Sequence, residues 1–176
     1  MAASGTVNDK LNVLVYFEAI ILNSNVANRL INSAFMNLLT KLLKNVKSPH
    51  LKLRLCPILG QLVRHSTVIG NEVAESGLAQ LLSEVVSDKN EKVRRKAVAS
   101  LGEFMFYAAT QLDDEQADPV WNLAPVAIKS LVKCLNQGED EVVRFYACKT
   151  IENITAQSIS AGCNFATLEV ATLLLN

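Results

Sequence analysis

A pattern that recurs every forty-odd positions constrains the fold of this chain more than any other feature. Three stretches, 38–67, 81–110 and 131–157, each begin with an apolar pair, pass through a polar loop and continue with an apolar residue followed by a basic one. The offset is 42 or 43 residues between the first two stretches and 50 between the last two. This period is typical of armadillo and HEAT arrays, in which stacked helical units share a continuous hydrophobic core.

Spacings of four in the later part of each stretch predict a helix with one buried face. In the first stretch the series is Leu51, Leu55 and Leu59, and the other two stretches have equivalent series. The chain has only seven glycines and four prolines in 176 residues, which favours long helices over many tight turns. We therefore expect an all-α fold, a right-handed α-solenoid of armadillo/HEAT-like repeats.

A short element upstream of the first two stretches also repeats, since residues 25–35 match residues 69–78. Armadillo units have such a short first helix, followed by a sharp turn. Gly77 lies where this turn is expected, and glycine accepts a positive φ without strain. Ser48 followed by Pro49 predicts an N-cap and the first position of a later helix.

These signals divide the chain, which we treat as a single solenoid segment over 1–176. The acidic stretch 111–119 accounts for the longer spacing before the last unit. Both ends are apolar and lack the polar outer face of a terminal repeat, so we expect a piece of a longer solenoid, or an isoform whose ends pack on something else or self-associate. The expected units are a partial repeat at 7–22, repeats at 25–66, 68–110 and 119–157, and a partial repeat at 160–176.

The charges are balanced overall but divided unevenly along the chain. Residues 1–70 contain eight Lys/Arg and two Asp/Glu, whereas residues 71–176 contain nine and fifteen. This gradient is either chance or a means of orienting a charged partner. The four cysteines have no CxxC spacing, and we interpret them as small buried side chains in a reducing compartment. The start lacks the apolar segment of a signal peptide, so we expect a cytoplasmic location without a membrane segment.

Residues 64–111 carry a more specific resemblance. The phrase RHST at 64–67, and DKNEKVRRKA followed by SLGEFMFY within 88–107, resemble the helical-repeat region downstream of the kinase-like domain in the fourth, pseudokinase member of the Unc-fifty-one-like kinase family and its Runkel-like plant counterparts. The resemblance implies a scaffolding role in microtubule- and cilium-related processes. It carries over no ATP-binding or catalytic residue, because the Gly-rich loop, HRD and DFG of a kinase are missing.

No motif in the chain indicates catalysis. The two histidines, His50 and His65, have no nucleophile and base signature beside them, and no HExxH, EF-hand or Walker pattern occurs. We therefore expect no enzyme, no cofactor, no metal site and no small-molecule substrate. Four acids could bind a divalent cation weakly or belong to a solvated loop: Asp113, Asp114, Glu115 and Asp118.

A basic run near the start of the second unit's last helix allows two interpretations. It could be a nucleic-acid or nuclear-localisation signal, or its arginine could pack against the acidic loop of the neighbouring unit. We favour the structural interpretation, because Lys52, Arg94 and Arg144 occupy the same slot in the three units and no aromatic stacking pattern accompanies the charges. The run consists of Lys89, Lys92, Arg94, Arg95 and Lys96.

The strongest functional signal is a series of polar residues at one slot of the last helix in each unit, the helix that lines the concave face of an armadillo solenoid. We expect a groove there for an extended segment of a partner protein, with Tyr107 as an anchor. The alternative is that any exposed helical stripe is polar. The predicted ladder contains Glu18, Gln61, Arg64, His65, Glu103, Tyr107, Lys149, Asn153 and Gln157.

Two further residues test this interpretation. Trp121 either fills the gap left by the acidic insertion or is an exposed interface anchor, and Phe106 is expected in the core beside Met105. The leading hypothesis is thus a non-catalytic scaffold for protein partners, including a kinase or a cytoskeletal protein. The alternative is a helical repeat that binds nucleic acid or microtubules through its basic N-terminal half.

Overall fold

The computed structural model describes residues 5–112 and 120–175, and every regular element in these ranges is helical. The all-α prediction is therefore confirmed. The helices are α1 (Val7–Ile20), α2 (Ser24–Ile31), α3 (Ala34–Asn45), α4 (Pro49–His65), α5 (Asn71–Ala74), α6 (Leu78–Val85), α7 (Glu91–Leu112), α8 (Pro125–Lys133), α9 (Glu141–Gln157), α10 (Ile159–Gly162), the 3-10 helix η1 (Cys163–Phe165) and α11 (Leu168–Leu175).

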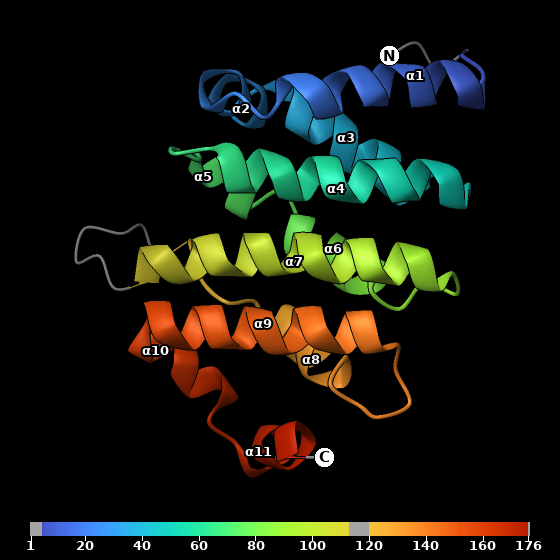
Figure 1. Cartoon of the computed structure of the whole chain (residues 1–176). Coiled ribbons are helices and arrows are strands. Elements are labelled where there is room, and N and C mark those ends of the chain that lie inside the picture. Colours follow the sequence, from blue (N-terminus) through green and yellow to red (C-terminus); the bar gives the residue numbers. More distant parts are fainter. Residues whose placement is uncertain (1–4, 113–119, 176) are drawn as a thin grey trace.

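Four long helices, α1, α4, α7 and α9, lie side by side in chain order and form what we call the long-helix layer (Figure 1). The shorter α3, α6 and α8 lie behind them, and the two ends of the chain are at opposite ends of the stack (Figure 1). Contacts follow the same order, since α1 packs on α4, α4 on α7 and α7 on α9. This is an α-solenoid, in which each unit contacts mainly its neighbours.

One hydrophobic core runs through the stack because the predicted four-residue series point inward. Leu55 and Leu59 on α4 are fully buried, as are Ala97 and Leu101 on α7. One core prediction was wrong: Phe106 is only half-buried, because it lies on the side of α7 that faces outward from the long-helix layer and not toward α6.

Neighbouring long helices approach closely where glycine faces a small hydroxyl residue. A Cβ placed on Gly60 of α4 would lie 2.8 Å from the Oγ of Ser100 and 3.0 Å from its Cα, and a Cβ on Gly102 of α7 would meet the hydroxyl of Thr150 on α9. The Ser100 hydroxyl donates to the Cys56 carbonyl at 2.6 Å. These glycines set the spacing of α4, α7 and α9.

Ion pairs join successive units at the slot that the sequence singled out. Lys52 contacts Asp88 at 2.6 Å and Arg94 contacts Glu139 at 2.6 Å, so the structural interpretation is confirmed for these two cations. Partial burial is the largest single effect on Asp88 and raises its pKa. The hydrogen bonds from Lys52 and the Asn90 N–H, together with the charges of Lys52 and Arg94, outweigh burial and hold the pKa of this carboxyl below its ordinary value. The pKa of Glu139 is lowered in the same way: burial is the largest single effect and raises it, but the hydrogen bonds from Arg94 and the Asp140 N–H, together with the charge of Arg94, outweigh burial.

Asparagines of one unit hold the segment that leads into the next. The Oδ1 of Asn28 accepts from the N–H groups of Thr67 at 2.9 Å and Val68 at 3.2 Å. The Oδ1 of Asn32 accepts from the N–H of Gly70 at 2.7 Å, and its Nδ2 donates to the Val68 carbonyl at 2.9 Å. Three backbone N–H groups of the segment between α4 and α5 thus find their acceptors on α2 and on the residue that follows it.

The predicted turn at Gly77 and the predicted start of α4 are both found in the structure. Gly77 has a φ of 75° between α5 and α6, as its position in the repeat predicts. Pro49 is the first residue of α4 and Ser48 is its N-cap, although the Ser48 side chain makes no capping hydrogen bond. Trp121 is 4% exposed and its indole N–H donates to Asn71 Oδ1 at 3.0 Å, so it is not an exposed anchor. Most of the acidic insertion beside it lies outside the described residues, so the expected filling of that gap stays a prediction.

The cysteine interpretation is correct for two residues and wrong for the other two. Cys56 and Cys134 are buried, and burial raises the pKa of each thiol to about 12. Cys148 is exposed, because it lies on the outward side of α9, and Cys163 is exposed as well. Within 5–112 and 120–175, no helix is long and apolar enough to cross a membrane. The acids of the 113–118 stretch and the expected repeat start at 119 lie outside the described residues.

Candidate functional site

Two adjoining hollows lie on the outward side of α4, α7 and α9. The first has a volume of about 430 Å³ and the second about 590 Å³. Both are lined by Arg64, Ala99, Glu103 and Tyr146, so together they form one groove, which we call the long-helix groove. Along α7 the lining extends from Lys92 into the last turns, a length of roughly 25 Å at the helical rise per residue. That length is enough for roughly eight residues of extended chain.

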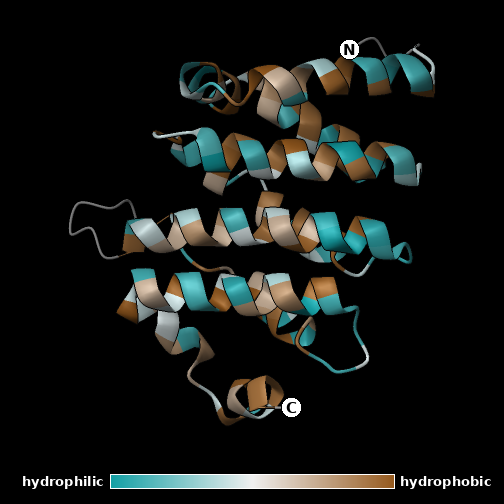
Figure 2. Cartoon of the chain, viewed as in Figure 1, coloured by the Kyte–Doolittle hydropathy of each residue, from teal (hydrophilic) through white to brown (hydrophobic). Residues whose placement is uncertain are grey.

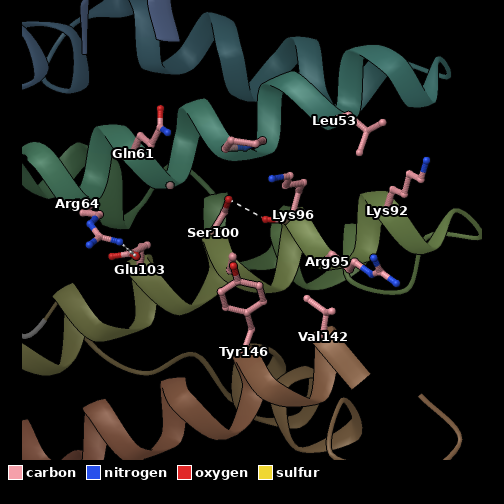
Figure 3. A pocket seen from close by; sticks show the side chains of 13 residues that line it. Leu53, Gln61, Arg64, Lys92, Arg95, Lys96, Ser100, Glu103, Val142 and Tyr146 are labelled. Carbon is pink, nitrogen blue, oxygen red and sulfur yellow. Dashed lines mark hydrogen bonds and ion pairs between the residues drawn. The ribbon is translucent and has the colours of Figure 1, made fainter. Parts of the chain in front are cut away.

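Apolar side chains from all three helices form part of the first hollow. Leu53 and Pro57 come from α4, Ala99 from α7, and Val142 and Tyr146 from α9. In Figure 3, Val142 and Tyr146 extend from α9 toward α7 across the gap between the two helices. The long-helix layer is accordingly mixed in hydropathy and not uniformly polar (Figure 2).

Glu103 lies where the two hollows meet. Its Oε1 accepts from the Arg64 guanidinium at 3.3 Å. Burial raises the pKa of Glu103 above its ordinary value, and the positive charges of Arg64 and His65 oppose that shift. A partly buried carboxylate with one long ion pair can exchange this partner for a ligand donor.

The cations of the first hollow differ in whether they form ion pairs within the protein. Arg95 donates to both carboxylate oxygens of Asp140, each at 2.8 Å, and also pairs with Glu91. Lys92 and Lys96 are exposed and form no ion pair with any residue that the structure describes. In Figure 3 both lysines extend from α7 toward α4.

The structure distributes the predicted ladder unevenly. The first hollow receives Gln61, Arg64 and Glu103, and the second receives Arg64, Glu103, Tyr107, Lys149 and Asn153. Glu18, His65 and Gln157 line neither hollow. Glu18 instead accepts from Arg54 at 2.7 Å, which joins α1 to α4.

Two ladder residues have roles that the sequence did not indicate. The Tyr107 hydroxyl accepts from the Ile69 N–H at 3.2 Å, and its ring meets Trp121 edge-on with centroids 4.9 Å apart. Tyr107 therefore supports the segment before α5 and is not a free anchor. The amide of Gln61 points away from α7 in Figure 3, and its Oε1 is buried with no hydrogen-bond partner among the described residues.

Sequence reasoning missed Val142, Tyr146 and the exposure of Lys96. A usable signal was present, because Lys96 and Tyr146 each lie seven residues before a ladder residue, Glu103 and Asn153. Seven residues are two helical turns, so both members of each pair share one face. Extending the ladder by two turns toward the start of each helix would have found these side chains.

In the part of the chain that the structure describes, no group of three or more His, Cys, Asp and Glu residues could hold a metal ion. Lys149, the other cation of the ladder, is paired with Glu152 at 2.9 Å on the rim of the second hollow. The groove lining combines amide, charged and apolar side chains.

Comparison with known proteins places the chain among kinase-related sequences. No family model matches it. It is 32% identical to the serine/threonine-protein kinase RUNKEL of Arabidopsis thaliana, over 96% of this chain, and 27% identical to the serine/threonine-protein kinase ULK4 of Mus musculus, over 98% of this chain. The chain spans only 13% of the length of each relative.

A solved structure supports the fold. A designed armadillo repeat protein, determined in complex with the peptide (KR)4, matches with a TM-score of 0.64 and 19% identity, over 97% of this chain and 74% of that one. The resemblance identified from RHST and the motifs within 88–107 is confirmed by both relatives. The chain is an armadillo-type helical-repeat segment homologous to a part of RUNKEL and ULK4.

Proposed function

We propose that this chain is a non-catalytic module for protein–protein interaction, and that the long-helix groove holds an extended segment of a partner protein. The observation that carries the proposal is the groove itself, in which amide, charged and apolar side chains from α4, α7 and α9 share one continuous surface. The designed armadillo protein of similar fold was solved with a peptide, which supports this use of the architecture.

Each kind of lining residue has a role in such a complex. The amide of Asn153 can donate to and accept from a peptide backbone, which offers both groups at every residue. The exposed ring of Tyr146 is an amphipathic surface on which a partner side chain can pack. Glu103 and Arg64 can each exchange their shared 3.3 Å contact for a bond to the ligand.

The experiment is selection of random twelve-residue peptides displayed on phage against the purified chain. We expect enriched peptides to lose at least tenfold in affinity for the variant Tyr146→Ala/Asn153→Ala. The control is Tyr16→Ala/Asn45→Ala, which removes the same two residue types from exposed positions on α1 and α3 and should leave binding within twofold. Equal binding to all three proteins would show that peptides use another surface.

We further propose a division into repeats and a cellular setting. The helices support repeats at 25–66, 68–110 and 119–157 between partial repeats at 7–22 and 160–176. Kinase-related relatives support a helical-repeat part of a larger kinase-like, pseudokinase-containing regulator, and the family resemblance adds a link to microtubules or cilia in the cytoplasm. Fluorescence microscopy of the tagged full-length parent, with and without the Tyr146→Ala/Asn153→Ala change, tests both the location and its dependence on the groove.

A second candidate is binding to microtubules or nucleic acid through the basic N-terminal half. It is favoured by Lys41, Lys44 and Lys47, which are all exposed on or just after α3. Microtubule pelleting at 50 and 200 mM salt separates the two functions, because binding through lysines to a polyanion weakens steeply with salt.

A further inference from the structure

We propose that the segment held by the long-helix groove is acidic, with glutamate or aspartate residues beside an apolar or aromatic one. The inference rests on the proposed function and adds the chemistry of the partner to it. The expected charge of this segment is opposite to that of the peptide bound by the designed armadillo protein, which is (KR)4.

The charges of the first hollow carry the argument. Four cations line it, Arg64, Lys92, Arg95 and Lys96, against the single carboxylate of Glu103. The protein itself satisfies two of them, since Arg95 pairs with Asp140 and Arg64 with Glu103. The other two remain available to a ligand.

Lys92 and Lys96 are four residues apart on α7 and so lie on the same face of one helix. Like charges at this spacing destabilise a helix, and no described carboxylate relieves them here. An anionic ligand removes that cost and adds attraction to both ammonium groups. Because both side chains are exposed, they can reorient around a bound carboxylate without any change in the core.

The same hollow requires an apolar residue in the ligand. Val142 and Tyr146 are 37% and 39% exposed, and Leu53 and Pro57 face them from α4 across the groove. An aromatic or branched side chain placed among these four residues would remove apolar surface from water. Carboxylates flanking that side chain would then reach Lys92 and Lys96.

A basic segment fits these charges poorly. It would meet two unpaired lysines, and its one carboxylate partner, Glu103, is already paired with Arg64 and has a pKa that burial raises. A single-stranded nucleic acid would bring phosphates against Glu103, and its bases would need stacking platforms. Of the groove's aromatic residues, Phe106 and Tyr107 are half-buried, which leaves Tyr146 as the exposed ring.

Fluorescence anisotropy with three labelled eight-residue peptides tests the inference. The acidic probe is Gly-Glu-Asp-Phe-Glu-Glu-Asp-Gly, the neutral probe replaces each acid by its amide, and the basic probe is (Lys-Arg)4. We expect the chain to bind the acidic probe at least tenfold more tightly than the other two. The variant Lys92→Glu/Lys96→Glu should lose at least tenfold for the acidic probe. The control Lys129→Glu/Lys133→Glu, which makes the same change of charge at two exposed positions four residues apart at the end of α8, should stay within twofold.

The outcomes separate the inference from the proposed function. Equal binding of the acidic and neutral probes, lost in Tyr146→Ala/Asn153→Ala, would overturn the acidic preference and leave the peptide groove standing. Failure of all probes and of the displayed peptide library would remove both. Tighter binding of a ten-nucleotide uridine RNA than of the acidic probe, lost in Lys92→Glu/Lys96→Glu, would assign the same cations to a nucleic acid instead. Circular dichroism confirms that each variant remains helical.

Discussion

The close approach of α4 and α7 makes a sharp prediction about Gly60. In Gly60→Ala the new Cβ would lie 2.8 Å from the Ser100 Oγ and 3.0 Å from both the Cα and the Cβ of Ser100. A hydroxyl can rotate away, but the Cα belongs to the α7 backbone, so α4 and α7 must separate. Overpacking of this kind costs roughly 1–3 kcal/mol, and we expect the upper half of that range because backbone is involved.

Alanine also returns some stability, because it is better than glycine in a helix interior by about 1 kcal/mol. The net loss in the free energy of unfolding is therefore about 1–2 kcal/mol, which lowers Tm by roughly 2–8 °C for a chain of this size. Urea denaturation followed by circular dichroism at 222 nm measures it. The control is Gly138→Ala, whose Cβ would meet no atom within 4 Å and which should change stability by less than about 0.5 kcal/mol.

A Gly60→Ala protein as stable as the wild type would refute the close approach of α4 and α7, and with it the depth of the first hollow. The same variant checks the groove independently, because Gly60 is one of the residues that line it. A methyl group at this position takes up part of the first hollow. The affinity for an enriched peptide should therefore fall together with the stability.

The remaining predictions use the same chain. Gly102→Ala should cost about 1 kcal/mol in urea denaturation, and Thr150→Ala in the same protein should recover most of it, because it removes the hydroxyl that the new Cβ meets. With Ellman's reagent, Cys148 and Cys163 should react in the native protein and the two buried thiols, whose pKa burial raises to about 12, only after denaturation; a third fast-reacting thiol would contradict the core. Asp88→Asn should lower stability by about 1 kcal/mol at pH 7. Because the folded-state pKa of this carboxyl is lowered, its contribution is present above 3.8 and is lost as pH falls through the lowered value, so melting curves of the two proteins should converge in acid and a constant gap would exclude the ion pair.

Much of the fold could be predicted because its determinants are local and recur. The four-residue apolar series and the cations at Lys52 and Arg94 depend on residues whose structural roles repeat from unit to unit. The turn at Gly77 was instead predictable because glycine accepts the positive φ, which no other described residue adopts. A repeat lets each unit serve as an independent observation of the same environment. That redundancy is why the slot of Arg94 could be interpreted correctly from three examples.

The site was less predictable because it depends on contacts between distant residues. The Tyr107 hydroxyl is occupied by Ile69, thirty-eight positions away, and no pattern around Tyr107 announces that bond. Cys148 lies within an apolar stretch, but α9 turns it outward. Periodicity places a residue on a helix face, whereas the exposure of that face depends on the packing of neighbouring units.

The asparagine bonds between α2 and the 67–70 segment determine how this protein can be cut and rejoined. A repeat that carried all its own hydrogen-bond partners could be excised as a cassette, and the flanking units would close over the gap. Here, removing α2 together with Asn32 would remove the acceptors of three backbone N–H groups that lead into the following unit, those of Thr67, Val68 and Gly70. Shuffled or shortened versions of the chain should therefore be joined in the middle of helices. Such junctions keep each asparagine in the same piece as the backbone N–H groups that it binds.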